Sequence, residues 1–175
     1  KKLNSKKILV TGGNGFLGSY VVAELKKQGA TDIFTPTHQE YDLTQRQACQ
    51  AVVKDRDIVI HLAALIGGIG FINKNQGEVF YDNLIMGTEL MEASRLAGVG
   101  KYLSVGTVCE YPKYTELPFK EKDLWKGFPD EITGAYGLAK KMAIVQGRAY
   151  KEQYGFNAVH LIPVNLYGPG DNFDH

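Results

Sequence analysis

The sequence has few cysteines, almost no net charge and no long hydrophobic run. Its two cysteines, Cys49 and Cys109, are too few for a disulfide framework, and no CxxC spacing suggests bound zinc. Free cysteines are typical of a reducing compartment, so we expect a cytoplasmic protein. The longest apolar stretch, residues 57–72, is interrupted by one histidine and three glycines, so no transmembrane helix is expected.

Charge and composition narrow the class of protein further. The 20 basic and 19 acidic residues give a formal net charge of +1, which favours neither a nucleic acid nor an anionic membrane as a partner. The 175 residues fit one domain, and 44% hydrophobic with 22% charged residues is the balance of an ordinary globular protein. Disordered and coiled-coil classes are therefore not expected.

Glycine, in contrast, is abundant. The chain holds 20 glycines, many of them in short clusters, where an average usage of about 7% would give about 12. Glycine is used where the backbone must approach a neighbour closely or adopt a positive φ. The clusters therefore indicate a ligand that is held by main-chain groups.

Short apolar runs alternate with amphipathic segments along the whole chain. The former are typical of strands buried on both faces, and the latter of helices. The expected strands are 7–11, 32–35, 57–62, 101–105 and 158–162, and the expected helices are 16–28, 45–54, 73–97 and 133–154. This alternation favours an α/β fold with a doubly wound parallel sheet of the Rossmann type. Residues 107–131 are expected to form a long functional loop.

The first motif of chemical interest follows the first expected strand. Residues 11–18 read TGGNGFLG, with Gly12, Gly15 and Gly18 between a strand and a helix. In dinucleotide-binding loops these glycines make the tight turn, admit the pyrophosphate and let the helix pack closely. The helix N-terminus adds free N–H groups and a partial positive charge. The order of strand, glycines and helix therefore predicts a bound dinucleotide.

The second motif is a tyrosine that stands four residues before a lysine on the last long helix. This spacing places Tyr136 and Lys140 on one helical face. A cation stabilises a phenolate, and lowering the pKa of tyrosine from about 10 to neutrality needs roughly 4 kcal/mol of differential interaction. We therefore expect Lys140 to lower the pKa of Tyr136 and to make it a usable general acid or base.

A family resemblance rests on four parts of the sequence. These are TGGNGFLG at 11–18, HLAA at 61–64, Asn83 and YGLAK at 136–140. They resemble the extended short-chain dehydrogenases/reductases, the NAD-dependent epimerase/dehydratase family, and the resemblance covers essentially the whole chain. It implies that residues 1–175 are the dinucleotide-binding domain, with a smaller substrate lobe expected beyond residue 175. It also implies that Thr107 hydrogen-bonds the substrate oxygen beside Tyr136.

The positions after Thr107 separate the branches of this family. Sugar-nucleotide 4,6-dehydratases are similar in placing an acid pair directly after that threonine, whereas this chain has Val108 and Cys109, with Glu110 out of register. A dehydratase is therefore disfavoured. The thiol at the second position resembles the GDP-L-fucose synthase branch, as do four further stretches. These are residues 67–69, 111–113, 165–169 and 171–173.

The resemblance implies an NADP-dependent GDP-sugar epimerase/reductase that converts GDP-4-keto-6-deoxy-D-mannose to GDP-L-fucose or a close relative. In that branch a cysteine and a histidine exchange protons at C3 and C5, and a hydride then reduces the ketone at C4. Cys109 matches the cysteine, whereas the histidine is expected beyond this chain, so His175 is not assigned. Thr107, Glu110 and Gly170 depart from the branch, which has Ser, an apolar residue and His there, and these departures leave the exact sugar open.

The resemblance also implies the residues of the site. Thr107, Cys109, Tyr136 and Lys140 are the expected catalytic residues, and Thr107, Cys109 and Asn165 are the expected substrate contacts. The expected cofactor contacts are Gly12, Gly13, Asn14, Gly15, Phe16, Leu17, Gly18, His38, Asp42, Leu43, Leu62, Ala63, Ala64, Tyr136, Lys140, Pro163, Val164, Asn165 and Leu166. No metal site is expected.

The loop after the second expected strand bears on the choice between NADP and NAD. An NAD site needs an acid there for the ribose hydroxyls. Residues 35–38 carry no carboxylate, and the first one after the strand is Glu40. We therefore expect NADPH to be preferred, with Asn14 and His38 as polar contacts. No arginine stands in this stretch, and NAD(H) is the alternative cofactor.

Two other functions stay open, an NAD-dependent NDP-sugar 4-epimerase and a non-catalytic dinucleotide-binding regulator. The trio of Thr107, Tyr136 and Lys140 argues against the regulator, because a sensor needs no proton donor. Cys49 and His61 are expected to be core residues.

The resemblance further implies a homodimer that forms through a four-helix bundle, built from the helices at 73–97 and 133–154. Apolar residues on these helices offer more surface than one sheet face covers. Those expected in the interface are Val79, Phe80, Met86, Ile144 and Val145.

Overall fold

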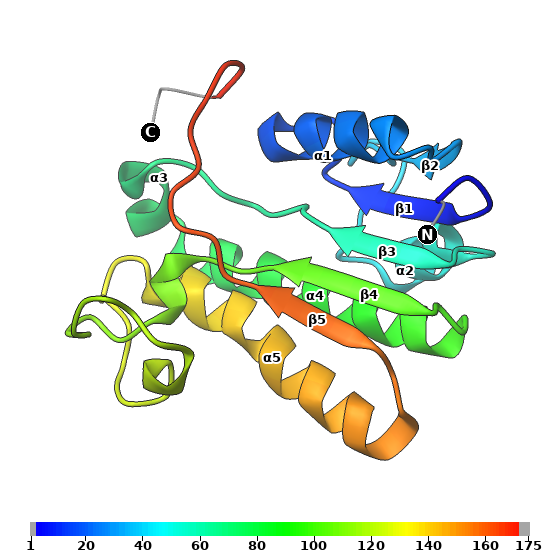
Figure 1. Ribbon diagram of the computed structural model, residues 1–175. Coiled ribbons are helices and arrows are strands. Elements are labelled where there is room, and N and C mark those ends of the chain that lie inside the picture. The colour runs from blue at the N-terminus through cyan, green and yellow to red at the C-terminus, as the bar shows by residue number, and fades with distance from the viewer. Residues whose placement is uncertain (1–2, 172–175) are drawn as a thin grey trace.

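The structure is a computed structural model that describes residues 3–171. These residues form a five-stranded sheet in which every strand is parallel to its neighbours, in the order β2-β1-β3-β4-β5 (Figure 1). The strands are β1 (Lys7–Thr11), β2 (Asp32–Phe34), β3 (Ile58–His61), β4 (Lys101–Val105) and β5 (Ala158–Leu161). The parallel Rossmann-type sheet that the sequence predicts is confirmed.

The helices follow the predicted alternation with strands. They are α1 (Phe16–Lys27), α2 (Arg46–Val53), α3 (Ile69–Lys74), α4 (Gln76–Leu96) and α5 (Gly134–Tyr154), with two 3₁₀ turns, η1 (Val108–Glu110) and η2 (Glu121–Asp123). Within residues 3–171, no helix is long and apolar enough to cross a bilayer. The turns η1 and η2 lie in the long loop that was expected between the fourth strand and the last helix.

The helix expected over 73–97 is divided at Asn75. The backbone of Asn75 leaves the helical region, with φ −122° and ψ 30°. Its side-chain amide donates to the carbonyl of Phe71 at 2.8 Å, a local bond by which asparagine competes with the helical ladder. The prediction of one continuous helix is therefore wrong, and α3 and α4 are separate.

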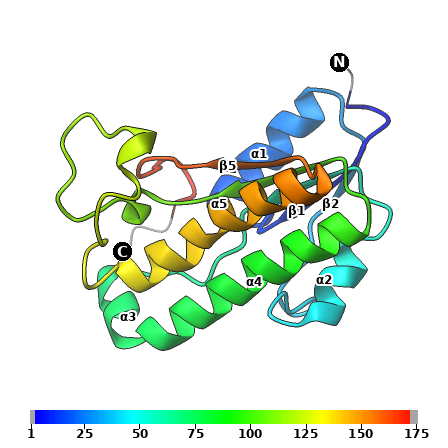
Figure 2. The same cartoon turned by 90° about the horizontal axis from the view of Figure 1, so that it is seen from below.

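Helices cover both faces of the sheet. Helix α1 lies on one face, and α2, α4 and α5 lie side by side on the other (Figures 1 and 2). Alternate residues of a strand point to opposite faces, so Ile8 and Val10 pack toward α1 whereas Leu9 packs into the larger core beneath α4. All three are fully buried. Burial on both faces explains why β1 is an unbroken apolar run.

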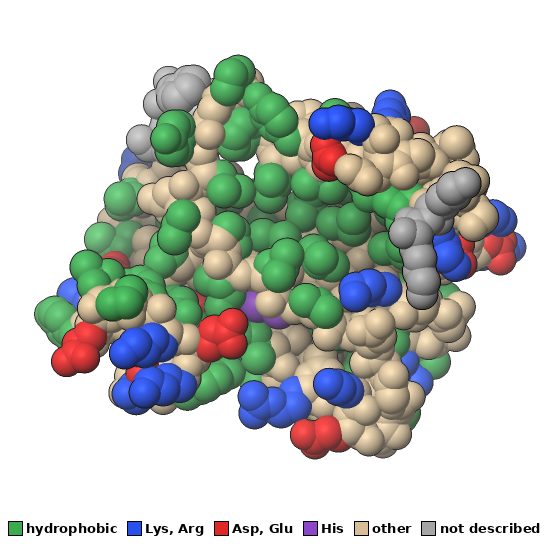
Figure 3. All heavy atoms as spheres, in the orientation of Figure 1, with side chains coloured by type: hydrophobic (Ala, Val, Ile, Leu, Met, Phe, Trp, Pro, Cys, Tyr) green, Lys and Arg blue, Asp and Glu red, His purple; other side chains and the backbone are tan. Residues whose placement is uncertain are grey.

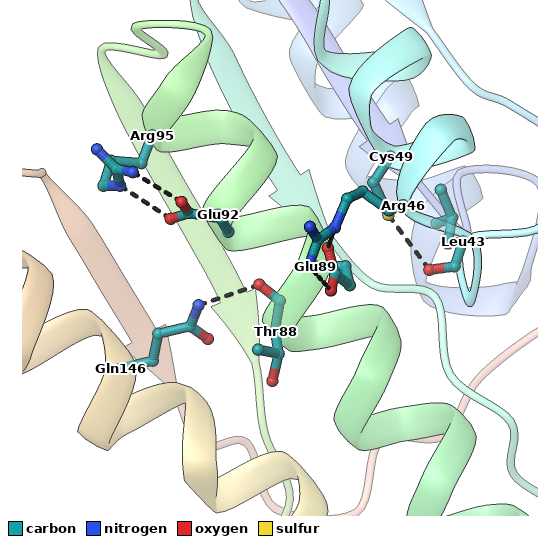
Figure 4. A network of polar contacts seen from close by, with 8 residues as sticks. All are labelled: Leu43, Arg46, Cys49, Thr88, Glu89, Glu92, Arg95 and Gln146. Atoms are coloured by element: carbon teal, nitrogen blue, oxygen red, sulfur yellow. Dashed lines mark hydrogen bonds and ion pairs between the residues drawn. The ribbon is translucent and has the colours of Figure 1, made fainter.

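Polar contacts join the three helices over the larger core (Figure 4). Arg46 of α2 donates two hydrogen bonds of 2.9 Å to Glu89 of α4, and Gln146 of α5 donates one of 3.0 Å to the carbonyl of Thr88. Cys49 is fully buried in α2, and burial raises the pKa of its thiol to about 12. Cys49 is thus a packing residue, as expected, because a thiol with a raised pKa is inert.

Helices α4 and α5 expose only part of the apolar surface expected for a dimer. Val79 and Met86 are buried in the core, so their expected place in the interface is wrong, because the turn of the helix directs them inward. Phe80 and Val145 are exposed by 38% and 49%, and Ile144 is half-buried. A dimer surface on these helices could therefore include Phe80 and Val145, but not Val79 or Met86.

Part of the sheet face on the α1 side carries no helix within residues 3–171. Hydrophobic side chains gather there, between α1 and the segment that follows β5 (Figure 3). Leu161 at the end of β5 is about half exposed, and Val164 and Leu166 in the following segment are exposed as well. This apolar surface continues toward the carboxyl ends of the strands.

Candidate active site

The carboxyl ends of β1 and β3 mark the point where the sheet reverses its winding. Strands β2 and β3 lie on opposite sides of β1, so the chain leaves these two neighbouring strands in different directions. Ligands of open α/β sheets bind in the crevice at such a switch point. The glycine motif follows β1 and the segment 62–65 follows β3, so both border this crevice.

Close backbone contacts shape the glycine motif. Gly12 has φ +69°, and a Cβ there would stand 2.8 Å from the backbone nitrogen of Ala63. A Cβ on Gly18 would overlap the carbonyl oxygen of Gly12, so only glycine lets α1 begin this close to the loop. A Cβ on Gly13 would overlap the side chain of Thr35, which follows β2. The loop is therefore a tight cradle of main chain.

The first turn of α1 is open to an anion. Gly15 is the N-cap of α1 and has an extended backbone, and it has no side chain with which to cap the first N–H groups. Those groups carry the positive end of the helix dipole and are free to bind a phosphate. The cradle that added Cβ atoms would fill, together with this helix start, fits the pyrophosphate of a dinucleotide.

A buried hydrogen bond joins the two loops that border the crevice. Thr11 at the end of β1 lies 2.8 Å from Nδ1 of His61 at the end of β3, and the Thr11 hydroxyl accepts the N–H of Ala63 at 3.3 Å. Burial, and next the charge of Lys140, lowers the pKa of His61 to about 3, so the ring is neutral. His61 is therefore a core histidine, as expected, and it fixes the segment 62–64 against the glycine loop.

The loop after β2 carries a carboxylate, that of Glu40. Thr37 donates its hydroxyl to Glu40 at 2.6 Å and its backbone N–H at 3.3 Å, and these bonds lower the pKa of the Glu40 carboxyl. Glu40 is thereby folded back toward the end of β2, in the same turn as the exposed His38. The Glu40 carboxylate is thus fixed in the turn that follows β2.

Asp42 and Leu43, two of the expected cofactor contacts, lead into α2. Asp42 accepts the hydroxyl of Thr44 at 2.7 Å and its N–H at 3.0 Å, and these bonds lower the pKa of Asp42. Leu43 is buried in the larger core. The Asp42 carboxylate is therefore already engaged within the loop, and Leu43 anchors the loop to the core.

The four expected catalytic residues meet where η1 packs on α5. Thr107 is the N-cap of η1 directly after β4, and Cys109 lies within η1. Tyr136 and Lys140 occupy successive turns of α5, and both are buried. A Cβ on Gly137 would overlap the carbonyl oxygen of Cys109. The backbone of η1 therefore lies directly on the helical turn that carries the tyrosine.

Burial sets the pKa values of the tyrosine and the lysine. The pKa of Tyr136 is raised, chiefly because desolvation disfavours the phenolate, and further by Cys109 and Glu110. The pKa of Lys140 is lowered to about 8 by desolvation, which the charge of Glu110 opposes. The expected lowering of the tyrosine pKa is therefore wrong. Tyr136 is a protonated phenol at neutral pH and is suited to donate a proton.

A small cavity with both polar and apolar walls borders Lys140. Its volume is about 10 Å³, which is about the least that can hold one water molecule. His61 and His160 also line it. Asn83 of α4 also lines this cavity. Its side-chain amide makes hydrogen bonds of 2.8 and 3.1 Å to the backbone of Leu65. Asn83 therefore ties the segment after β3 to α4, beside the lysine.

The segment after β5 leads from the sheet toward α1. Tyr20 of α1 donates its hydroxyl to the carbonyl of Pro169 at 2.9 Å, and Gly168 lies against the ring of Phe16. Residues 163–166, where further cofactor and substrate contacts are expected, are half-buried or exposed along this path (Figure 1). Asn172, Phe173 and His175 lie outside the described residues.

Two groups beside this site, one fully buried and one partly buried, are missing from the sequence-based assignment. Glu110 is fully buried, accepts the N–H of Thr107 at 2.9 Å and is paired with His160 of β5 at 3.0 Å. The spacing of Thr107 and Glu110 is that of a capping box, a signal that could have identified the glutamate. No local signal points to His160, because it stands 50 positions away and reaches Glu110 only through the strand order.

Comparisons with known proteins agree with this fold. The model of the NAD dependent epimerase/dehydratase family matches residues 8–175. A GDP-L-fucose synthase from Sinorhizobium fredii is 35% identical over 174 residues, which cover 98% of this chain and 55% of that protein. The chain thus spans about half the length of the curated relatives it matches.

Two solved structures from Campylobacter jejuni are also similar. A GDP-mannoheptose C4 reductase with NADP bound has a TM-score of 0.92 and 29% identity, over 98% of this chain and 55% of its own. A GDP-D-glycero-L-gluco-heptose synthase, solved in the presence of NADPH, has a TM-score of 0.93 and 30% identity, over 99% and 51%. The similarity therefore extends along nearly all of this chain.

Proposed function

The chain belongs to the NAD dependent epimerase/dehydratase family, and from this membership we propose that the full-length protein is an NADP-dependent GDP-sugar epimerase/reductase. Its substrate is GDP-4-keto-6-deoxy-D-mannose, and its product is GDP-L-fucose or a close relative. The observation that carries this function is the packing of η1, with Thr107 and Cys109, on the turn of α5 that holds Tyr136. The names of relatives, a GDP-L-fucose synthase and a GDP-mannoheptose C4 reductase, support the GDP-sugar class.

The main-chain cradle at the switch point serves the cofactor. Gly12, Gly15 and the first turn of α1 would hold the pyrophosphate, and Asn14 and His38 would supply polar side chains. NADPH bound there supplies the hydride that reduces a ketone. The relatives solved with NADP or NADPH support this choice of cofactor.

The reduction needs a proton on the ketone oxygen as the carbon gains its hydride. Tyr136 donates that proton, and its raised pKa keeps the proton in place until the oxygen becomes basic. The hydroxyl of Thr107 hydrogen-bonds the same oxygen. Lys140 lies one helical turn further along α5, and its ammonium would stabilise the phenolate that remains, since a nearby opposite charge favours the ionised form.

Epimerisation needs a group that exchanges protons with carbon, and Cys109 takes this part. A carbon beside a ketone is acidic, because its negative charge spreads onto the oxygen that Thr107 and Tyr136 hydrogen-bond. Cys109 transfers a proton on one face of that carbon, and a second acid–base group, a histidine by the family resemblance, acts on the other. Hydride transfer to C4 needs neither group.

A second candidate, an NAD-dependent NDP-sugar 4-epimerase, is favoured by Glu40. A carboxylate at the end of β2 accepts hydrogen bonds from ribose hydroxyls and repels a 2′-phosphate. Tyr136 would then have to take a proton from a sugar hydroxyl as a base, and its raised pKa disfavours that direction. The reductase is therefore the better supported function.

The proposed assembly is a homodimer that forms through the exposed faces of α4 and α5. Phe80, Tyr81 and Val145 are exposed by 38%, 61% and 49%, and together they supply an apolar surface for a four-helix bundle. Sedimentation of the full-length protein at micromolar concentration tests the dimer. A monomer there contradicts it.

A direct assay tests the function. Full-length protein incubated with GDP-4-keto-6-deoxymannose and NADPH is expected to consume NADPH and to form a GDP-6-deoxyhexose whose configuration at C3 and C5 is inverted, as read by NMR. Interconversion of UDP-glucose and UDP-galactose with NAD instead would establish the 4-epimerase. Failure of both reactions in protein that binds NADPH contradicts the reductase.

A further inference from the structure

A fully buried carboxylate lies directly beneath the candidate active site. Glu110 is 0% exposed, and acidic side chains are almost never buried to this extent unless they are paired. Its Oε1 accepts the backbone N–H of Thr107 at 2.9 Å, and Nε2 of His160 lies 3.0 Å from Oε1 and 3.2 Å from Oε2. The carboxylate thus joins the turn after β4 to strand β5.

The partner histidine is itself held in place. Ser104 and His160 are register partners on β4 and β5, and the Ser104 hydroxyl lies 2.8 Å from Nδ1 of His160. A carboxylate only accepts hydrogen bonds, so Nε2 carries the hydrogen that faces Glu110. In the neutral ring Nδ1 then accepts the hydroxyl of Ser104. Both ring nitrogens are therefore engaged, and the imidazole has one defined orientation.

Two glycines leave room for the contacts around this turn. A Cβ on Gly106 would overlap both the Glu110 carboxylate and Nε2 of His160. A Cβ on Gly137 would overlap the carbonyl oxygen of Cys109 on the opposite side of the turn. From α5, buried Lys141 donates its ammonium to the carbonyl of Glu110 at 3.1 Å. The turn is thus fixed from β4, β5 and α5 together.

These contacts determine where the two reactive side chains of the turn lie. Thr107 forms a complete capping box with Glu110, and the Thr107 hydroxyl oxygen accepts the N–H of Cys109 at 3.2 Å. The hydroxyl oxygen is therefore oriented by the turn, while its own hydrogen stays available to a ligand. The place of the Cys109 thiol depends on the same backbone.

We propose that Glu110 and His160 are positioning residues, which hold the turn at residues 107–110 so that Thr107 and Cys109 present their hydroxyl and thiol to the GDP-keto sugar. The inference rests on the proposed function. A buried carboxylate–imidazole contact is weak evidence for stability, because an apolar replacement of such a pair is often equally stable. The placement of Thr107 and Cys109 is therefore the main contribution that we assign to the pair.

Two substitutions at position 110 test whether the side-chain hydrogen bonds of Glu110 are needed to hold the turn. Glu110→Val removes the acceptor for Thr107, whereas Glu110→Gln keeps an amide oxygen for that N–H and an amide donor toward His160, whose ring can adopt the other tautomer. In the full-length enzyme, Glu110→Val is expected to lower kcat by about 10- to 100-fold, the usual result of a misplacement near 1 Å. The KM for NADPH should be unchanged, and Glu110→Gln should recover most of kcat. Glu116→Val, an exposed glutamate of the same loop, is the matched control with normal kcat.

Three results with these variants would contradict the proposal. A normal kcat in folded Glu110→Val, a loss of NADPH affinity in proportion to kcat, or a Glu110→Gln variant as impaired as Glu110→Val would each overturn the positioning role. If Glu110→Val fails to fold, His160→Gln replaces it, because Glu110 stays in place and only the oriented ring is lost. A normal kcat in that variant overturns the role of His160.

Thiol chemistry keeps this test separate from the proposed function. If wild-type protein reduces no GDP-keto sugar, the function is wrong, but alkylation of Cys109 by iodoacetamide, followed by mass spectrometry, still reports on the turn. Glu110→Val should change that alkylation rate several-fold and Glu110→Gln should not, with buried Cys49 as the unreactive internal reference. Equal rates in wild type and Glu110→Val overturn the inference without any enzymatic assay.

Discussion

Gly137→Ala is the most informative change at the contact between η1 and α5. The added Cβ would stand 2.6 Å from the carbonyl carbon of Cys109, overlap its oxygen, and lie 3.2 Å from the backbone nitrogen of Glu110. These atoms belong to the backbone, so η1 itself must shift. Overpacking costs about 1–3 kcal/mol, and alanine offsets about 1 kcal/mol through its helix propensity. A net destabilisation of about 0–2 kcal/mol follows.

The effect on turnover should be larger than the effect on stability. A shift of η1 that relieves the overlap moves Thr107 and Cys109 by about 1 Å, and such a misplacement costs about 10²-fold in rate. Gly87→Ala is the control, because nothing lies within 4 Å of a Cβ at that position of α4. It should keep kcat and raise Tm by a few degrees. Thermal unfolding and kcat are measured for both variants, and a Gly137→Ala enzyme as stable and active as Gly87→Ala would refute the reasoning.

Three further predictions concern proton transfer and the cofactor. Tyr136→Phe should bind NADPH normally and lose most of the reduction, because only the proton donor is removed; near-normal turnover would remove its assigned role. The rate of reduction should fall as the pH rises through about 8, because the pKa of the buried Lys140 ammonium is lowered to about 8. A pH–rate profile that stays flat to pH about 10, the ordinary range of a lysine, contradicts this. Glu40→Gln should tighten NADPH binding relative to NADH, because it removes the carboxylate that Thr37 holds near the end of β2, and a titration that shows no change separates Glu40 from the ribose site.

The strands and the glycine motif could be predicted because their signals are local. Ile8, Leu9 and Val10 are apolar in succession because both faces of β1 are covered. Each glycine of the motif meets its own physical requirement, the positive φ at Gly12 and the close approach at Gly18. Such requirements leave a spacing in the sequence that needs no knowledge of distant segments.

The features that escaped prediction depend on contacts between separate segments or on burial. The i, i+4 spacing of Tyr136 and Lys140 identifies neighbours on a helix, but it says nothing of the desolvation that raises the pKa of the phenol. Comparison with the family marks Glu110 only as a departure from its pattern, and the pairing of Glu110 with His160 requires β4 and β5 to be adjacent. The break at Asn75 depends on one side-chain bond within a sequence that otherwise favours a helix.

Solvent-deuterium exchange in a Cys109→Ser variant tests most directly whether this site epimerises a GDP-keto sugar. Full-length wild-type protein in D2O should introduce deuterium at C3 and C5 of GDP-4-keto-6-deoxymannose before reduction. Cys109→Ser should lose that exchange and still reduce the unepimerised ketone with NADPH, because Tyr136 and the cofactor cradle are intact. Exchange at the normal rate in Cys109→Ser would mean that Cys109 is a packing residue and that the site does not epimerise through this thiol.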